Sequence, residues 1–282
     1  MGKKNLFLVV VLLVVALWGS AALALDPMGP PTAELKKGQF SAGAEYSDSR
    51  MDIKLNKGNF LRNVYHLGLP LSSTSGSLSS FKIKHLKMHK VYANLGYGVM
   101  DNWETFVRLG GMNTEFRGDF FSDESKTYNG DTGTAFGFGT KATFYEKDKL
   151  KLGGLFQMSW GSSKARLFGA NWSESVELNI VEMQIAVGPN YQLTETVSIY
   201  GGPFWHFVNF DSSDLKGRRK VDTDPSQDDY FVRQVSYDID DVSYFGAYIG
   251  TQIEIVKNTF YSIEYQHTAT ADALAMSLIW RF

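Results

Sequence analysis

The sequence contains no cysteine and only seven prolines in 282 residues. Without cysteine, an exported chain forms no disulfide and must be held together by hydrogen bonds and packing, and a lipid-modified N-terminal cysteine is excluded. An excess of charge of one sign is also lacking, because the formal net charge is −2. The abundant residues are glycine (27), tyrosine (14) and phenylalanine (20), a composition that suits a twisted sheet with aromatic girdles.

The first 24 residues have the layout of a secretory signal peptide. Lys3 and Lys4 precede an apolar run that ends at Trp18, and small residues follow it, so we predict cleavage between Ala24 and Leu25. The alternative is an uncleaved anchor helix, although the run is shorter than the ~20 residues that span a bilayer. Removing the leader takes away two lysines and no acid, which moves the net charge from −2 to −4, too little to indicate a nucleic-acid partner.

The last nine residues alternate strictly between apolar and mixed positions. Ala275, Ser277, Ile279 and Arg281 separate the apolar residues Leu274, Met276, Leu278, Trp280 and Phe282. A period of two places the apolar set on one face of a strand. This segment resembles the C-terminal strand of bacterial outer-membrane β-barrel proteins. The resemblance implies that these five residues form the signal read by the barrel-assembly machinery.

The same alternation recurs along the chain. Short turns are expected at 100–102, 146–149, 193–196 and 256–259, and long polar connections at 48–86, 113–133, up to about 177, and 210–241. The Ser/Thr-rich tract 72–77 is expected in an exposed loop. Long outer loops alternating with short periplasmic turns are typical of bacterial barrels. We therefore predict, over residues 38–282, an all-β, antiparallel, up-and-down transmembrane barrel of about ten strands. Eight or twelve are the alternatives, because 48–86 could hide a hairpin.

The segment before the barrel and the second face of the strands complete the prediction. Residues 25–37 are expected to be a short, poorly ordered periplasmic lead-in. The second face repeats glycine and serine and carries a balanced set of charges: Lys90, Arg108, Lys141, Lys151 and Arg281 against Glu45, Glu104, Glu182, Glu254 and Glu264. We predict that these ten residues form a charge network in a narrow lumen, since open aqueous channels need roughly sixteen strands. The alternative is a soluble sheet whose apolar face is packed inward.

Candidate enzymatic residues lack a supporting pattern. His267 lies late in the chain, where outer-membrane lipid A deacylases carry His-x-Ser, but Ala269 stands at the serine position and Asp272 is the only later acid. Without a nucleophile beside the base there is no activated serine. An omptin-like protease would need acidic and His–Asp pairs; Asp228, Asp229, Asp240, Asp241 and His206 supply the residue types without a motif. We predict no catalytic residue.

Candidate ligand sites are equally sparse. Asp222, Asp224, Asp228 and Asp229 could offer oxygens to calcium, but a full loop signature is missing. His85 and His89 share a strand face about 13 Å apart, too far for one metal. The basic run 216–220 could contact lipopolysaccharide phosphates or be a solvated loop. We predict no metal and no cofactor.

We expect a non-enzymatic outer-membrane barrel with a structural or surface-interaction role. The alternative is a narrow porin-like channel for small solutes, and the third possibility is a lipid-modifying or proteolytic enzyme of the outer membrane. The expected partners are outer-membrane lipids, lipopolysaccharide and the assembly machinery, with no nucleic acid, and we expect a monomer.

Overall fold

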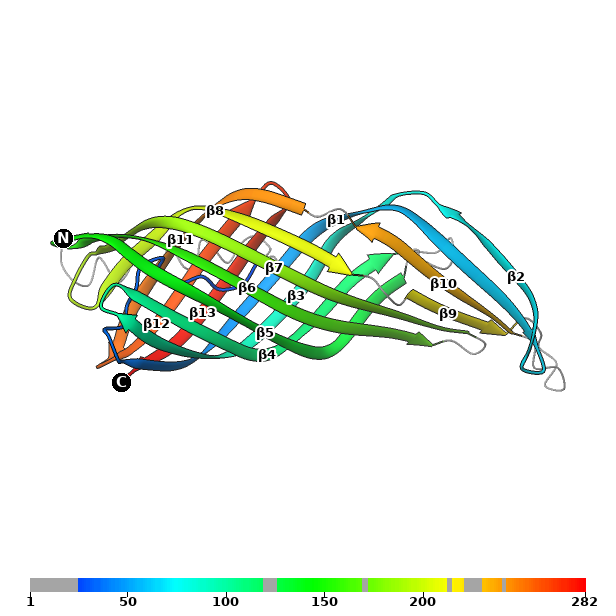
Figure 1. Cartoon of the computed structure of the whole chain (residues 1–282), viewed down its shortest axis with the longest axis horizontal. Helices are drawn as coiled ribbons and strands as arrows, with labels where there is room; N and C mark the ends of the chain where they lie inside the picture. The colour runs from blue at the N-terminus through cyan, green and yellow to red at the C-terminus, as the bar shows by residue number, and fades with distance from the viewer. Residues whose placement is uncertain (1–24, 119–125, 169–171, 212–214, 221–229, 240–241) are drawn as a thin grey trace.

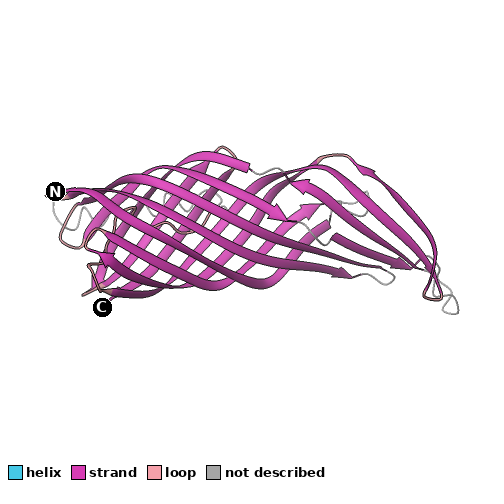
Figure 2. Cartoon of the chain, in the orientation of Figure 1, coloured by secondary structure: helices cyan, strands magenta, loops and turns pink. Residues whose placement is uncertain are grey.

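A computed structural model describes residues 25–118, 126–168, 172–211, 215–220, 230–239 and 242–282. The described residues form thirteen antiparallel strands (Figures 1 and 2). The strands are β1 (Phe40–His66), β2 (Leu69–Leu78), β3 (Phe81–Met100), β4 (Trp103–Gly118), β5 (Lys126–Lys147), β6 (Leu150–Phe168), β7 (Trp172–Gln192), β8 (Val197–Asp211), β9 (Leu215–Lys220), β10 (Tyr230–Ile239), β11 (Val242–Val256), β12 (Thr259–Thr268) and β13 (Ala271–Arg281). In this part of the chain no helix is long and apolar enough to cross a membrane.

Ten of the described strands close into a ring. The order is β1, β3, β4, β5, β6, β7, β8, β11, β12 and β13, and β13 returns to pair with β1. The predicted antiparallel barrel of about ten strands is therefore confirmed. Closure is tight at the C-terminus, where the backbones of Phe40 and Phe282 exchange hydrogen bonds of 3.0 and 2.9 Å.

Short turns join the strands at the end of the barrel that carries the C-terminus (Figure 1). The pairs Met100↔Trp103, Lys147↔Leu150 and Val256↔Thr259 close three of these hairpins at the predicted positions. In bacterial barrels such short turns face the periplasm, so the opposite end faces outward.

The outer end differs from the sequence prediction. The tract 72–77 is not a loop: it lies in β2, which pairs with the distal part of β1. Most of 113–133 likewise belongs to β4 and β5, and the described part of 210–241 includes β9 and β10. These predictions of long loops are wrong because the strands continue past the length that a membrane requires, about 9–11 residues. The strands β8, β11, β12 and β13 are shorter than the flanking strands β7 and β1. Past their outer ends, the β9–β10 hairpin pairs with β7 on one side and β1 on the other and closes the wall.

An apolar band encircles the ten-stranded ring on its outward face. Outward side chains such as Leu95 (59% exposed), Leu109 (70%) and Trp280 (52%) have no protein cover. Along β13 and the terminal Phe282, the outward apolar residues span positions 274–282, close to the length expected of a membrane-crossing strand. Exposed apolar residues arranged as a continuous belt around a closed barrel mark a lipid-facing surface.

Directly paired charges begin where the band ends. Beyond the band, four acid–base pairs lie on directly opposed residues of neighbouring strands: Asp48–His89, Lys87–Glu115, Lys164–Glu177 and His267–Asp272. A fifth such pair, Glu146–Lys151, lies at the opposite rim, beside the short turn at 147–150. We call the ring up to the end of the apolar band the membrane half, and the described parts of the strands beyond it the outer half.

The interior of the outer half is a packed apolar cluster. Its inward side chains include Met51, Leu86, Met88, Met112 and Ile180, each at most 2% exposed. The cluster draws on most strands of the wall, from β1 to β13. A core of this kind is what a water-exposed sheet builds. The interior of the outer half is therefore mainly apolar, with the Lys126–Glu174 pair as a largely buried polar exception.

Candidate functional site: the filled lumen

The N-terminal segment lies inside the membrane half. Leu25, Asp26 and Met28 are at most 1% exposed, and Thr32 and Leu35 are also buried. The prediction of a poorly ordered lead-in is therefore wrong for residues 25–35, which we call the plug. A short polar segment at the start of the chain gives no sign in its own composition that a lumen will enclose it.

Two carboxylates of the wall hold the plug through its backbone. Glu264 on β12 accepts the N–H groups of Met28 (2.6 Å) and Gly29 (2.8 Å). Glu104 on β4 accepts those of Glu34 (2.7 Å) and Leu35 (2.9 Å). Hydrogen bonds to a charged acceptor are about twice as strong as neutral ones. Each carboxylate therefore fixes two consecutive peptide units.

Other side chains of the wall satisfy the remaining plug groups. Arg108 and Gln157 donate to the carbonyl of Pro27, Gln266 donates to that of Asp26, and the hydroxyl of Thr143 accepts the N–H of Ala33. Pro27, Pro30 and Pro31 have no N–H to satisfy. A buried backbone is tolerated only when its polar groups are paired, and here the wall provides the pairing that a sheet would otherwise provide.

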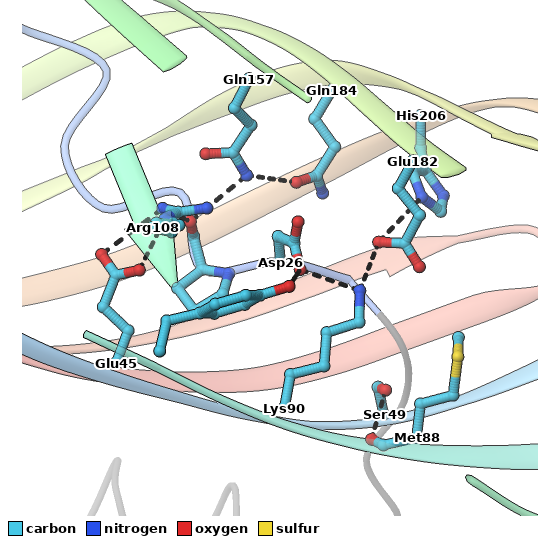
Figure 3. A network of polar contacts seen from close by, with 12 residues as sticks. Asp26, Glu45, Ser49, Met88, Lys90, Arg108, Gln157, Glu182, Gln184 and His206 are labelled. Carbon is cyan, nitrogen blue, oxygen red and sulfur yellow. Dashed lines mark hydrogen bonds and ion pairs between the residues drawn. The ribbon is translucent and has the colours of Figure 1, made fainter. Parts of the chain in front are cut away.

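Ion pairs fix the inner end of the plug (Figure 3). Lys90 on β3 donates to Asp26 (2.8 Å) and to Glu182 of β7 (2.7 Å). Arg108 pairs with Glu45 of β1 at 2.6 Å. All of these side chains are at most 7% exposed. Removing one member of such a buried set leaves an uncompensated charge, which is strongly destabilising.

Apolar contacts support the same segment. Leu25 and Met28 pack in one cluster with Leu155, Ala186, Tyr200, Phe204, Tyr248 and Ala273, which come from five strands of the wall. The Tyr200 hydroxyl also donates to Glu264 at 3.1 Å. The plug is thus a part of the folded interior, in contact with nearly the whole circumference of the ring.

The ten residues predicted as a lumen charge network have three different positions. Glu45, Lys90, Glu104, Arg108, Glu182 and Glu264 are buried around the plug. Lys141 and Arg281 line a small cavity of about 60 Å³ beside it, and Arg281 pairs with Glu34 of the plug at 3.2 Å. Lys151 and Glu254 lie instead at the periplasmic rim, where Lys151 pairs with Glu146 and Glu254 caps the turn at Asn258. These two are outside the network because the strands end there.

Several residues of this site escaped the sequence prediction. Asp26, Gln157, Gln184 and Gln266 are buried and bonded in the lumen, and Gln184 links Gln157 to Gln266. Gln157, Gln184 and Gln266 stood on the predicted inward face, so listing every inward polar residue would have found them. Asp26 lies in the segment expected to be disordered, and no strand pattern points to it.

The other candidate residues lie apart from the plug or outside the described residues. His267 pairs with Asp272 on the outward face, where Tyr265 also bonds Asp272. His89 pairs with Asp48, and no cluster of metal-ligating residues occurs among the described residues. His206 is fully buried beside Glu182. Asp222, Asp224, Asp228, Asp229, Asp240 and Asp241 are outside the described residues, and the run 216–220 forms most of β9.

A polar vestibule opens below the plug on the periplasmic side. Its volume is about 340 Å³, and its lining includes Glu34, Asn190, Gln252 and Arg281. Asn190 donates to Thr32 and Glu34 of the plug at 3.2 and 3.0 Å. The vestibule therefore ends at the plug and its wall contacts.

Comparisons with known proteins find similar solved structures but no family. No family model and no curated protein matches the chain. Similar solved structures include the translocator domain of the autotransporter NalP from Neisseria meningitidis (11% identity, 88% of this chain and 90% of that one, TM-score 0.43). The outer membrane protease OmpT from Escherichia coli (10%, 92% and 99%, 0.41) and an outer membrane channel from Pseudomonas putida F1 (10%, 92% and 100%, 0.43) are also similar.

At these identities and TM-scores the likeness says nothing about what the chain binds or does. The fold rests on the molecule itself: a closed antiparallel ring, an outward apolar band, and a polar interior behind that band. The chain has the fold of an outer-membrane β-barrel.

Proposed function

We propose that this protein is a non-enzymatic, non-conducting outer-membrane barrel with a structural and surface-interaction role. The observation that carries the proposal is the filled interior. Residues 25–35 fill the membrane half and bond to side chains of the wall. The apolar cluster fills the outer half. Within the described residues these two barriers of different chemistry lie in series, which supports a barrel that does not conduct ions.

The length of the strands supports the surface role. β1 has 27 residues and β5 has 22, whereas about 9–11 residues cross a membrane. The strands that continue past the apolar band build a folded body outside the bilayer, which is where lipopolysaccharide and other surface molecules are found. We also propose that the chain reaches the membrane by export, with the signal peptide removed after Ala24, and that it acts as a monomer inserted by the barrel-assembly machinery.

The experiment that tests the proposal is conductance across a planar bilayer. We compare the wild-type protein with a variant lacking residues 25–37, both first checked for a mobility shift on boiling, which reports a closed barrel. Both should be electrically silent, because the apolar cluster remains in the variant. Steady single-channel steps from the wild type would refute the proposal. Single-channel current steps from the deletion variant alone would show that the plug is the only barrier, and would favour the alternative function of a narrow channel for small solutes.

An enzymatic role is tested separately. Purified protein incubated with lipopolysaccharide should leave the lipid A mass spectrum unchanged. A mass change that disappears with His267→Ala would overturn the non-enzymatic assignment and point to the His267–Asp272 pair on the outward face.

A further inference from the structure

The buried charges at the Leu25 end of the plug are unevenly paired. Among the described residues, the carboxylates Asp26, Glu45 and Glu182 contact two buried cations, Lys90 and Arg108. Arg108 neutralises Glu45, whereas Lys90 alone serves both Asp26 and Glu182. An uncompensated charge in a buried site is costly, so this cluster needs one more cation.

An open acceptor marks the place where that cation belongs. Glu182 is 2% exposed and uses one carboxylate oxygen for Lys90, while its Oε1 has no hydrogen-bond partner. The ring of His206 lies beside it (Figure 3), but its Nε2 is 3.9 Å from Glu182 Oε2 and neither ring nitrogen has a hydrogen-bond partner. Buried polar atoms are nearly always hydrogen-bonded, so the unpaired Oε1 of Glu182, an acceptor, indicates a missing donor.

The chain itself has a nitrogen near this cluster. Leu25 is fully buried and directly precedes Asp26, so its Cα lies about 3.8 Å from that of Asp26. Asp26 in turn shares Lys90 with Glu182. The peptide bond before Leu25 is the one that the Ala22-Leu23-Ala24 pattern marks for cleavage.

Cleavage of this bond changes the charge of the cluster. A leader peptidase of the export pathway adds one water molecule to the Ala24–Leu25 bond, which leaves a carboxylate on the released leader and an amine on Leu25. The protonated amine has a positive charge and three N–H donors, whereas the uncleaved amide has no charge and one donor.

We infer that the α-ammonium of Leu25 is the missing cation, and that it binds Glu182 inside the lumen. The plug is then fully bonded to the wall only in the processed chain, so its seating in the lumen depends on maturation. This inference rests on the proposed removal of the signal peptide. Its test reports on the N-terminal amine, so it is independent of the conductance experiment.

The first part of the test locates the N-terminus. Protein purified from the outer membrane should begin Leu-Asp-Pro-Met by N-terminal sequencing and intact mass. It is then treated near neutral pH with an amine-acylating reagent, because an α-amine (pKa roughly 8) reacts there before lysine (roughly 10.4). The amine of the folded barrel should react about tenfold or more slowly than that of boiled protein.

The second part compares two isosteric variants of the same strand. Glu182→Gln removes the proposed partner and should restore most of the reactivity of the amine. Glu174→Gln is the matched control, because Glu174 is also a buried carboxylate of β7 but pairs with Lys126 in the outer half. It should leave the amine protected.

Three results would overturn the inference: a mature N-terminus at another residue, an amine as reactive in folded as in boiled protein, or protection that persists in Glu182→Gln. If Glu182→Gln shows no mobility shift on boiling, the variant has not folded, and a second sample is used in its place. In this sample the wild-type chain is unfolded, its α-amine is carbamylated, and the chain is then refolded. That chain should refold into a barrel whose plug is open to protease, and a fully protected plug would refute the contact.

Discussion

The membrane half and the outer half are built from the same strands with opposite patterns. On β7 the inward residues Glu182 and Gln184 of the membrane half are followed, toward the outer end, by inward Ile180 and Leu178. On β1 the inward residues change from Ser47 and Ser49 to Met51 and Ile53. The backbone alternation continues, while the chemistry of the two faces is exchanged.

The exchange follows from the solvent outside each half. Lipid surrounds the membrane half, so its outward positions are apolar and its interior is free to be polar. Water surrounds the outer half, so the hydrophobic effect drives apolar residues inward as in any soluble sheet. The polarity of the barrel interior thus depends on the solvent outside the wall and on whether another chain segment fills the lumen.

The two interiors also differ in how they are filled. The outer half is filled by side chains of its own wall. In the membrane half the charged side chains leave room, and a separate chain segment supplies backbone N–H and carbonyl groups as partners. The comparison teaches that polar residues lining a closed lumen indicate a hydrogen-bonding group inside it, here a segment of the same chain.

The largest expected effect comes from placing a charged residue, of the kind found inside the membrane half, in the apolar interior of the outer half. Leu86→Glu puts a carboxylate in the apolar cluster, where Leu86 is 0% exposed. We expect a loss of about 5 kcal/mol or more in the free energy of unfolding, from the desolvated charge and the lost apolar burial. Urea unfolding in vesicles, followed by tryptophan fluorescence, measures it. Arg166→Glu, on the exposed face of β6, is the control and should change stability by at most about 0.5 kcal/mol.

The next effect concerns the polar interior of the membrane half. Lys90→Met leaves Asp26 and Glu182 buried without their shared cation. We expect a loss of about 3–5 kcal/mol and release of the plug, seen as new protease cleavage near residue 30 in intact vesicles. The matched variant Lys126→Met removes a 20% exposed lysine from Glu174 in the outer half and should leave the plug resistant. Cleavage in both variants, or in neither, would contradict the proposed local role of Lys90.

The sequence was sufficient to predict the wall of the membrane half, although not the plug inside it. Alternation of Val91, Leu95 and Tyr97 with Lys90 and Asn94 predicted both faces of β3, and the structure has these faces as expected. The ten-stranded ring and its short turns followed from the same pattern, because lipid on one side and a filled lumen on the other maintain a strict period of two.

The outer half could not be predicted in the same way. Between Ser47 and Met51 the apolar residues move from the outward to the inward face, so a search for one continuous apolar face loses the strand there. The positive φ of His85 (56°) and the register shift between Met51 and Ile53 break the period further. The plug was missed for a different reason. Its contacts join residues more than 60 positions apart, and no local pattern encodes them.

A smaller effect tests the position of the lipid boundary. Leu95→Arg places a charge at the middle of the outward apolar band of β3, and we expect a loss of about 2–4 kcal/mol. Asn129→Arg adds the same residue to an exposed position on β5 in the outer half, where it should have little effect. Equal losses at both positions, measured by urea unfolding in vesicles, would place the boundary elsewhere.

The smallest expected effect concerns the paired charges that begin above the band. Lys164 on β6 and Glu177 on β7 are directly opposed and 2.6 Å apart, with side chains 38% and 31% exposed. Lys164→Ala should cost about 0.2–1 kcal/mol, the usual range for a partly exposed cross-strand pair. A double-mutant cycle with Glu177→Ala isolates the pair, and its coupling should shrink as salt is added, because water reaches both groups. A coupling that is large and independent of salt would mean that this pair is shielded from water, and the lipid-facing band would then extend far enough along β6 and β7 to include it.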